Sequence, residues 1–252
     1  MKVKKILVSQ PPPENGKSPY FELAEKNNLS IDFRPFIHIE GIPAKEFRQD
    51  RIDILEHSAV IFTSKTAVDH FFRICEDLRL TVPDTMKYFC ISEATAYYLQ
   101  KYIIYRKRKI FYGNGMFPDL MDLINKHRDE IFVVPLSNHH KKEIPKTLKE
   151  QKIQFTKAIL YRTVCSDLSD LTLTNYDMLV FFSPSGIKSL MQNLPDFKQN
   201  NIKIASFGST TASAVEQAGL RLDVKAPMPE APSMTMALDM YIKEHNKNLH
   251  KK

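Results

Sequence analysis

The sequence predicts an α/β fold of two similar lobes, each with a parallel sheet flanked by helices, joined by a two-stranded β-ladder. One short sequence motif occurs four times: an apolar strand ends in small hydroxyl residues, and a helix begins directly after them. The copies form two pairs, one in each half of the chain, with order and spacing kept. Strand-like apolar runs also alternate with helical patterns, which is typical of parallel sheets built from βα units.

The four copies lie at residues 60–68, 88–96, 179–187 and 204–212. Ser64 corresponds to Ser183, and Thr95 corresponds to Thr211. A strand that leads straight into a helix leaves free backbone N–H groups at the helix start, which attract anions. Because parallel sheets bind ligands beyond the carboxyl ends of their strands, the four starts could converge on one cleft. The alternative for each hydroxyl is that it only caps its own helix.

Strands are expected where short β-type apolar runs are bounded by turn residues, and helices where apolar residues recur at helical spacing. The expected strands lie near residues 3–9, 58–63, 87–91, 102–105, 109–112, 131–135, 177–182, 202–207 and 221–225. The expected helices lie near residues 18–28, 65–78, 93–101, 116–127, 140–151, 185–193, 210–218 and 231–245.

Two extended runs, residues 31–40 and 156–164, fall outside this alternation and could pair as a connecting ladder. Only three strands are expected after residue 168, which is fewer than a typical sheet contains. The N-terminal strand is therefore expected to complete that sheet.

This layout divides the chain into three parts, with a simple tandem arrangement as its alternative. Residues 1–32 and 168–252 form a discontinuous α/β lobe, residues 33–46 and 156–167 form the ladder, and residues 47–155 form an inserted α/β lobe.

The composition is that of an ordinary globular chain with a positive bias. There are 36 Lys and Arg residues against 29 Asp and Glu, a formal net charge of +7, which favours acidic ligands. The N-terminal apolar run is too short for a signal peptide, and no segment is long and apolar enough to span a bilayer. Three scattered cysteines suggest reduced thiols. We therefore expect a cytoplasmic protein without a membrane partner.

Several kinds of chemistry lack their motifs. No CxxC or HExxH pattern occurs, so no metal is expected. The GxG that begins at Gly113 lacks the third glycine of the dinucleotide fingerprint, and no Walker lysine motif is present. Because there is no GxSxG elbow, we interpret the serines as ligand-binding residues and not as nucleophiles.

The most specific motifs lie in the second half. Residues 181–186 (FFSPSG) and 208–212 (GSTTA) resemble the FFSPSG and GPTTA signatures of the uroporphyrinogen-III synthase family, at suitable spacing. Residues 62–68 and 94–96 match the corresponding first-half signatures more loosely. The resemblance covers nearly the whole chain.

The resemblance implies the discontinuous lobe, no cofactor and one reaction. The reaction is ring closure of hydroxymethylbilane, a linear tetrapyrrole with acetate and propionate side chains, with inversion of its last pyrrole ring and loss of water. The chain would then be a cyclising hydro-lyase of tetrapyrrole and haem biosynthesis. It would be monomeric, without a nucleic-acid partner, and in transient contact with the preceding pathway enzyme. The alternative is an inactive two-lobed module that binds an acidic small molecule or tetrapyrrole for regulation or carriage.

Residue by residue, the resemblance implies that Tyr161 is catalytic and assists departure of the substrate hydroxyl. Without it, a tyrosine in an alternating strand is more often a packing residue. Thr95 and Thr211 match threonines expected to hold substrate carboxylates. The other expected substrate-binding residues lie on loops that lead into helices: Thr63, Ser64, Ser183, Ser185, Gly208, Ser209 and Thr210.

Three positions depart from the family's pattern. Ser209 replaces a proline, and this change should alter the binding loop little because Gly208 and the threonines remain. Glu93 stands where a small or polar residue is common; its carboxylate stabilises a helix start but would repel an anionic substrate if it faced the site. Thr66 replaces an arginine found in some members, a missing counter-charge for which Lys65 could substitute.

Two basic clusters lie outside these motifs. Residues 106–109 (RKRK) are either a contact for nucleic acid or an acidic substrate, or a solvated turn between two strands, which is the favoured interpretation. Residues 139–142 (HHKK) either border the ligand surface of the inserted lobe or form a solvated helix start.

Overall fold

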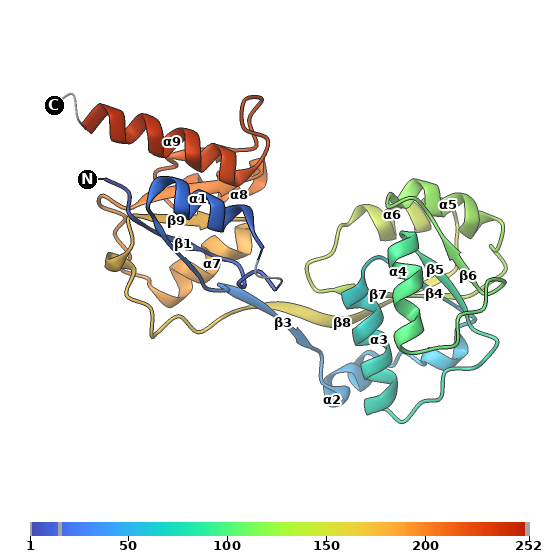
Figure 1. Ribbon diagram of the computed structural model, residues 1–252. Coiled ribbons are helices and arrows are strands. Elements are labelled where there is room, and N and C mark those ends of the chain that lie inside the picture. Colours follow the sequence, from blue (N-terminus) through green and yellow to red (C-terminus); the bar gives the residue numbers. More distant parts are fainter. Residues whose placement is uncertain (1, 15–16, 250–252) are drawn as a thin grey trace. The chain divides into compact units, whose positions relative to one another are not determined.

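The computed structural model describes residues 2–14 and 17–249, and the chain divides into two compact units. Unit 1 comprises Met1–His38 and Val164–Lys252, and unit 2 comprises Ile39–Thr163. Each unit has its own sheet with helices packed on it (Figure 1). The chain therefore passes from one unit to the other twice, and unit 1 is discontinuous in sequence.

Within the described residues, the sheet of unit 1 has five strands in the order β11-β10-β9-β1-β2, paired in parallel. These strands are β1 (Lys5–Val8), β2 (Ser30–Phe33), β9 (Met178–Phe181), β10 (Lys203–Phe207) and β11 (Val224–Ala226). Leu7 of β1 lies opposite Asp32 on one side and Leu179 on the other. The N-terminal strand thus joins a sheet whose other members include the last three strands.

Helices cover both faces of this sheet. Their bounds are α1 (Pro19–Asn27), α7 (Pro184–Asn193), α8 (Ser209–Gln217) and α9 (Met234–Leu249). Because side chains alternate along a strand, Ile6 and Val8 pack with α1 and α9, whereas Leu7 packs with α7 and α8. Unit 1 therefore buries one hydrophobic layer on each side of its sheet.

In unit 2, every residue of which is described, the sheet has the order β3-β8-β7-β4-β5-β6. Its strands are β3 (Ile37–Gly41), β4 (Ala59–Phe62), β5 (Lys87–Cys90), β6 (Ile110–Tyr112), β7 (Phe132–Ser137) and β8 (Phe155–Cys165). The neighbours from β8 to β6 pair in parallel.

Strand β3 pairs with β8 in the opposite direction. The N–H of Ile42 donates to the carbonyl of Leu160 at 2.8 Å, and that of Ser166 donates to the carbonyl of Phe36 at 2.9 Å. As the residue number rises on one strand it falls on the other, so the pair is antiparallel. The chain crosses between the units within these two strands.

Helices also cover both faces of the second sheet, with α3 and α4 on one face and α5 and α6 on the other. Their bounds are α3 (Lys65–Asp77), α4 (Glu93–Tyr98), α5 (Phe117–Asn125) and α6 (Glu143–Glu150), and a short α2 (Ala44–Phe47) precedes them. Short 3₁₀ helices occur at Arg48–Asp50, Ile54–Glu56, Leu99–Lys101 and Leu173–Asn175. These parallel sheets flanked by helices confirm the predicted fold class.

The prediction of a strand at residues 102–105 is wrong. An irregular segment runs from the 3₁₀ turn after α4 to the start of β6 at Ile110. This segment does not pair with β6, which is the edge strand of its sheet. Its apolar side chains make other contacts instead. The Tyr102 ring stacks on Phe72 with 4.5 Å between centroids, and Ile104 is 78% exposed. Residues 107–109 form the favoured turn, but no strand precedes it.

The extended run at residues 31–40 is divided between two partners. Strand β2 belongs to the sheet of unit 1, and only β3 pairs with β8. None of the helices in the described part of the chain is long and apolar enough to cross a membrane.

Candidate functional site

The predicted hydroxyl residues lie where helices begin directly after strands. In unit 2, α3 follows β4 and α4 follows β5; in unit 1, α7 follows β9 and α8 follows β10 (Figure 1). In each unit the two strands are parallel neighbours, so both helix starts lie at the carboxyl edge of the sheet. Each unit therefore presents a pair of helix N-termini at one edge.

Serine caps three of these helix starts. Ser64, Ser92 and Ser183 each accept a hydrogen bond from the N–H three residues further on, at 3.0, 3.4 and 3.2 Å respectively. Each side chain thus satisfies one free donor of its helix. Because a hydroxyl that accepts still has a proton to donate, capping leaves Ser64 and Ser183 able to contact an anion. Ser185, in the first turn of α7, is half-buried.

Helix α8 begins differently, at a glycine. Its N-cap is Gly208, with φ 87° and ψ 150°, and no side chain of that residue caps the helix. Only glycine adopts this backbone conformation readily, which explains the residue type. The first N–H groups of α8 therefore lack an N-cap side chain, and with the helix dipole behind them they favour an anion.

The side chains at this start differ in exposure. Ser209 and Thr210 are exposed, whereas Thr211 is only 1% exposed. In the preceding strand, the buried hydroxyl of Ser206 has no hydrogen-bond partner among the described residues. Ser209 and Thr210 are thus placed to meet a ligand, and Thr211 is enclosed by its own unit.

Thr95 holds the same place in α4 as Thr211 does in α8, the third helical residue. It is 4% exposed, and its hydroxyl lies 3.2 Å from the Ser92 Oγ. Both predicted cleft threonines are therefore buried beneath a helix start.

A pocket of about 560 Å³ opens in unit 2 beside the start of α3. Three of the predicted residues line it, Thr63, Ser64 and Tyr161, and we call it the Tyr161 pocket. Its other walls come mainly from residues 115–118 and 136–144, at and beyond the carboxyl ends of the strands. Thr95 is not among the lining residues, and the remaining predicted residues belong to unit 1.

A bulge in β8 brings Tyr161 to this pocket. Pairing with β7 is regular as far as Leu136 opposite Ile159, and then shifts so that Ser137 lies opposite Tyr161. A bulge re-aims side chains, and here the consecutive residues Leu160 and Tyr161 are both buried. Tyr161 is 8% exposed, and its hydroxyl makes no hydrogen bond within the described residues. The hydroxyl is therefore available to a ligand.

The ring of Tyr161 stacks on His70 of α3, with 4.9 Å between centroids and 16° between planes. His70 Nδ1 accepts a hydrogen bond from Arg73 Nε at 3.2 Å, so this nitrogen carries no proton. Burial is the larger cause that lowers the pKa of His70, and the positive charge of Arg73 is the second. The negative charge of Asp69 acts in the opposite direction but does not outweigh them. A neutral imidazole therefore supports the tyrosine ring.

Arg73 also fastens α3 to the strands beside it. Its guanidinium donates to the carbonyl oxygens of Ile42 at 2.8 Å and Leu160 at 3.2 Å. A Cβ on Gly41 would lie 2.6 Å from this guanidinium, so a larger residue there would push the guanidinium away from its two carbonyl partners. Sequence reasoning missed His70 and Arg73, because their one signal is an i,i+3 spacing in the part of α3 that lies beyond the motif at residues 62–68.

The loop between β7 and α6 forms another wall of the Tyr161 pocket. His139, His140 and Lys141 line the pocket, and α6 begins only at Glu143. The Nδ1 of His140 lies 2.8 Å from the Ser137 carbonyl oxygen, which can only accept, so this nitrogen carries the proton. Residues 139–141 therefore border the Tyr161 pocket and precede α6, and the ligand-bordering interpretation stays a prediction.

The two charged residues that raised questions in the sequence both have partners. The Tyr112 hydroxyl donates to Glu93 at 3.1 Å, and this bond raises the pKa of Tyr112. Lys65 Nζ lies 5.3 Å from the centroid of the Tyr98 ring, a cation–π contact. Neither Glu93 nor Lys65 lines the Tyr161 pocket.

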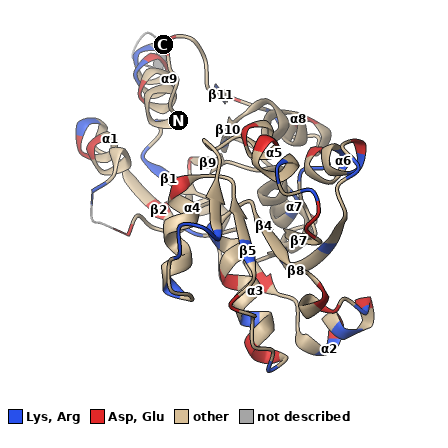
Figure 2. Cartoon of the chain, turned by 90° about the vertical axis from the view of Figure 1, so that its right-hand side faces the viewer, with Lys and Arg blue, Asp and Glu red and all other residues tan. Residues whose placement is uncertain are grey.

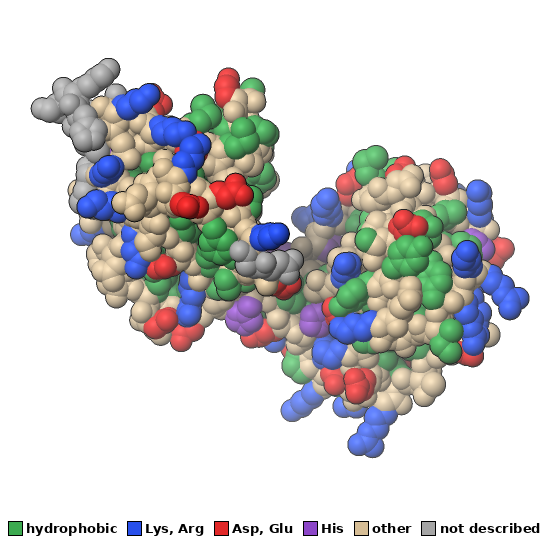
Figure 3. All heavy atoms as spheres, viewed as in Figure 1, with side chains coloured by type: hydrophobic (Ala, Val, Ile, Leu, Met, Phe, Trp, Pro, Cys, Tyr) green, Lys and Arg blue, Asp and Glu red, His purple; other side chains and the backbone are tan. Residues whose placement is uncertain are grey.

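Charged side chains of both signs are interspersed over each unit on the face drawn in Figure 3, and the positions of Lys, Arg, Asp and Glu alternate along the cartoon in Figure 2. In the basic run at residues 106–109, Arg106 pairs with Asp84 at 3.5 Å, and the run does not line the Tyr161 pocket. Across residues 2–14 and 17–249, no group of three or more His, Cys, Asp and Glu side chains is arranged to hold a metal ion.

Comparison with known proteins points to one family. The family model described as uroporphyrinogen-III synthase HemD matches residues 18–236. The uroporphyrinogen-III synthase of Chlorobaculum parvum is 22% identical in an alignment 258 positions long, which covers 94% of this chain and 98% of the relative. That of Saccharomyces cerevisiae is 28% identical in an alignment 114 positions long, which covers 39% of this chain and 41% of the relative.

Solved structures show the same fold. The uroporphyrinogen-III synthetase of Helicobacter pylori superposes with a TM-score of 0.57 at 19% identity, covering 96% of this chain and 99% of that one. A mutant uroporphyrinogen III synthase of Thermus thermophilus gives a TM-score of 0.50 at 16% identity, covering 99% of this chain and 100% of that one.

Proposed function

Since this chain belongs to the uroporphyrinogen-III synthase family, we propose that it closes hydroxymethylbilane to uroporphyrinogen III, inverting the last pyrrole ring and releasing water. The family match over residues 18–236 is the observation that carries the proposal. The free hydroxyl of Tyr161 and the start of α8 support it, because the reaction needs a proton donor and anion binding. The alternative of an inactive binding module rested on Glu93 and on the missing counter-charge at Thr66, and nothing in the family match favours it. Glu93 is hydrogen-bonded to Tyr112, and Lys65, beside Thr66, lies over the Tyr98 ring.

The substrate is a flexible polyanion, so the protein must hold carboxylates. In unit 1 the N–H groups that begin α8 bind a carboxylate, with the exposed Ser209 and Thr210 beside them. In unit 2 Thr63 and Ser64 act in the same way in the Tyr161 pocket. The full set of proposed substrate-binding residues is Thr63, Ser64, Thr95, Ser183, Ser185, Gly208, Ser209, Thr210 and Thr211.

Tyr161 is the proposed proton donor. Its phenol protonates the terminal hydroxyl, which leaves as water and gives an electrophilic azafulvene. Attack by the far pyrrole at its substituted carbon forms a spiro intermediate, and fragmentation with reclosure gives the inverted ring. The proton that the pyrrole ring loses when it regains aromaticity balances the one given to the hydroxyl. Orientation of the two reacting ends supplies much of the rate.

The proposal includes further properties of the protein. It acts as a monomer without a cofactor, in the cytoplasm, in transient contact with the enzyme that makes hydroxymethylbilane. All three cysteines are free thiols, which supports a reducing compartment. Residues 33–46 and 156–167 form a connecting ladder between a lobe of residues 1–32 and 168–252 and an inserted lobe of residues 47–155.

The test is the isomer ratio of uroporphyrin, after oxidation, when fresh hydroxymethylbilane cyclises with and without the purified protein and without added cofactor. The expected result is a clear shift from the uninverted type I product to type III. A ratio equal to that without protein, from a sample whose circular dichroism shows a folded α/β protein, would overturn the proposed function.

A further inference from the structure

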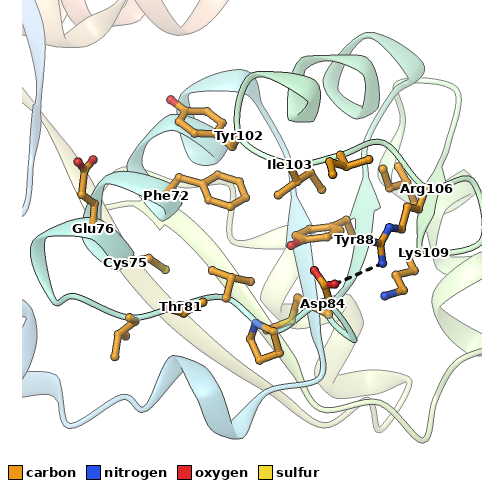
Figure 4. Close-up of a pocket in the computed structure, with 16 residues that line it drawn as sticks. Phe72, Cys75, Glu76, Thr81, Asp84, Tyr88, Tyr102, Ile103, Arg106 and Lys109 are labelled. Carbon is orange, nitrogen blue, oxygen red and sulfur yellow. Dashed lines mark ion pairs between the residues drawn. The ribbon is translucent and has the colours of Figure 1, made fainter.

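Unit 2 contains a second pocket, which shares no lining residue with the Tyr161 pocket. Its volume is about 570 Å³, within the range of small-molecule sites. The walls come from the last turns of α3, the loop between α3 and β5, and the segment between α4 and β6 (Figure 4). We call it the Tyr88 pocket; the proposed synthase reaction gives it no role.

The inner wall of the Tyr88 pocket is apolar. Phe72, Met86 and Ile103 line it, and Ile103 points into it in Figure 4. Ile104, also a lining residue, leaves 78% of its surface exposed. This is the segment whose apolar residues form no strand, and an apolar ligand would remove part of their surface from water.

One polar group inside the pocket lacks a partner. Tyr88 is 4% exposed, its hydroxyl points into the pocket in Figure 4, and this hydroxyl makes no hydrogen bond within the described residues. Burial raises the pKa of Tyr88, so the phenol is a neutral donor. A buried donor gains from a ligand that carries an acceptor.

Two cationic side chains, Arg106 and Lys109, lie at one end of the pocket together with Asp84, and Glu76 lies at the opposite end (Figure 4). The turn bond from the Lys109 N–H to the Arg106 carbonyl, 2.9 Å, brings both side chains to the end shown in Figure 4. Arg106 pairs with the well-exposed Asp84 at 3.5 Å, a weak surface pair, whereas Lys109 makes no ion pair within the described residues. The Tyr88 N–H donates to the Lys109 carbonyl at 2.7 Å, so the backbones of the two residues are adjacent, and both side chains line the pocket.

We propose that the Tyr88 pocket binds a small organic carboxylate with an apolar body. The carboxylate pairs with Lys109 and accepts from the Tyr88 hydroxyl, and the body lies against Phe72, Met86 and Ile103. Within the basic run, Arg106 and Lys109 line the pocket and Lys107 does not, and of the two lining residues Arg106 already has an ion-pair partner.

The probe is octanoate, titrated into the ¹⁵N-labelled full chain below the concentration at which it forms micelles. Amide shifts are expected in residues 80–88 and 102–110. Lys109→Met should weaken binding about fivefold, as expected for one partly exposed charge pair, while Lys107→Met, the same change in the same run, should leave it within about twofold. Tyr88→Phe keeps the ring and removes only the hydroxyl, so it should also weaken binding.

Three results would overturn the proposal. One is the absence of shifts in these segments. Another is equal weakening by Lys107→Met and Lys109→Met, which would mean attraction by the general surface charge. The third is octylammonium or 1-octanol binding as tightly as octanoate, which would show that the carboxylate group is not needed for binding. Thermal unfolding and the amide spectrum of each variant without ligand show that it is folded.

Discussion

The side chain of Tyr161 is held at its ring and free at its hydroxyl. The ring stacks on a neutral His70, and the β8 bulge sets the direction of the side chain. The hydroxyl has no partner within the described residues, and the Tyr161 pocket lies in front of it. A phenol fixed in this way needs little reorganisation before it gives up a proton, which is what a general acid requires.

Tyr161→Phe is expected to lower kcat by about 10²–10⁴-fold, the usual contribution of a positioned general acid, while product affinity changes little. The ring and its stacking on His70 remain, so only the proton is lost. Single-turnover kinetics with hydroxymethylbilane and equilibrium binding of uroporphyrinogen III measure the two quantities. Tyr97→Phe is the matched control, since Tyr97 is exposed and outside both pockets of unit 2. Equal rates in Tyr161→Phe and the unchanged chain would remove Tyr161 from the mechanism.

Ser209→Pro is expected to stabilise the protein by about 0.4–1 kcal/mol, because proline restricts the unfolded chain. Ser209 is the first residue of α8, where the N–H has no intrahelical acceptor and proline is favoured. The preceding Gly208 has ψ 150°, a value that a following proline permits. Urea unfolding of the variant measures the change, with Ser213→Pro, four residues further into the same helix, as the destabilised comparison. A loss of stability in Ser209→Pro would show that the start of α8 needs the Ser209 N–H.

Single residues also show which features of the site could be predicted from the sequence. The serine caps could be predicted, because capping depends on residues three apart in sequence. The enclosure of Thr95 and Thr211 could not, because it depends on what packs around the first turn of each helix. The family resemblance pointed to Tyr161, but the residue that stacks on it comes from α3, about ninety residues earlier in the chain, and only the tertiary fold brings the two together.

Among the elements, α3 links the most features of unit 2. It begins at Ser64 in the Tyr161 pocket, carries His70 and Arg73 in its middle, and ends in the wall of the Tyr88 pocket. Arg73 bonds to carbonyl oxygens at the end of β3 and within β8, so the position of α3 and that of Tyr161 are set together.

Gly41→Ala is expected to destabilise the protein by about 1–3 kcal/mol, because it would break the hydrogen bonds that the charged Arg73 side chain donates to two carbonyl oxygens. The new Cβ would meet the Arg73 guanidinium at 2.6 Å and displace it from Ile42 and Leu160. A double-mutant cycle in urea separates this cause from others, since Gly41→Ala should cost much less when Arg73→Ala is already present. The same cost in both backgrounds would mean that the strain lies elsewhere.

Elements with a clear period were predictable, and those set by neighbours were not. The strand–helix starts followed from short apolar runs ending in hydroxyl residues. The segment at residues 102–105 has a strand-like alternation, yet Tyr102, Ile103 and Ile104 line the Tyr88 pocket. Tyr105 stacks on Tyr97 of α4. The alternation shows only which side chains are apolar. A strand also needs a neighbouring strand to pair with, and residues 102–105 do not pair with the edge strand β6.

The molecule as a whole consists of two units, each with its own sheet and two hydrophobic layers. Unit 1 depends on contacts between residues far apart in sequence, since β1 pairs with β9 and α1 packs beside α9. The need for the first strand was predictable, because the second half has too few strands for a sheet. The contacts between α1 and α9 were not, because they join two ends of the chain that no local pattern relates.

Asp239 of α9 fastens these two helices. It accepts hydrogen bonds from Lys243 at 2.7 Å, Asn27 at 2.9 Å and Lys26 at 3.0 Å, the last two on α1. Burial would raise the pKa of Asp239, but these bonds outweigh it and lower the pKa from 3.8 to about 2. Because the folded pKa lies below the unfolded one, the carboxylate stabilises unit 1 fully above pH 3.8, and this contribution is lost as the pH falls through about 2.

Asp239→Asn is therefore expected to be less stable than the unchanged chain at pH 7 and at pH 5, with the difference shrinking below the unfolded pKa of 3.8 and vanishing near pH 2. The loss should appear in unit 1, because the bonds join helices of that unit. Hydrogen exchange at pH 7 tests this, with protection reduced in β1 and β9 and unchanged in β4 and β5. Asp122→Asn, an exposed carboxylate of α5 without an ion pair in the described residues, should change neither the pH dependence nor the exchange. Equal loss of protection in both sheets would mean that the units unfold as one, and a stability difference independent of pH would mean that Asp239 acts by packing and not by charge.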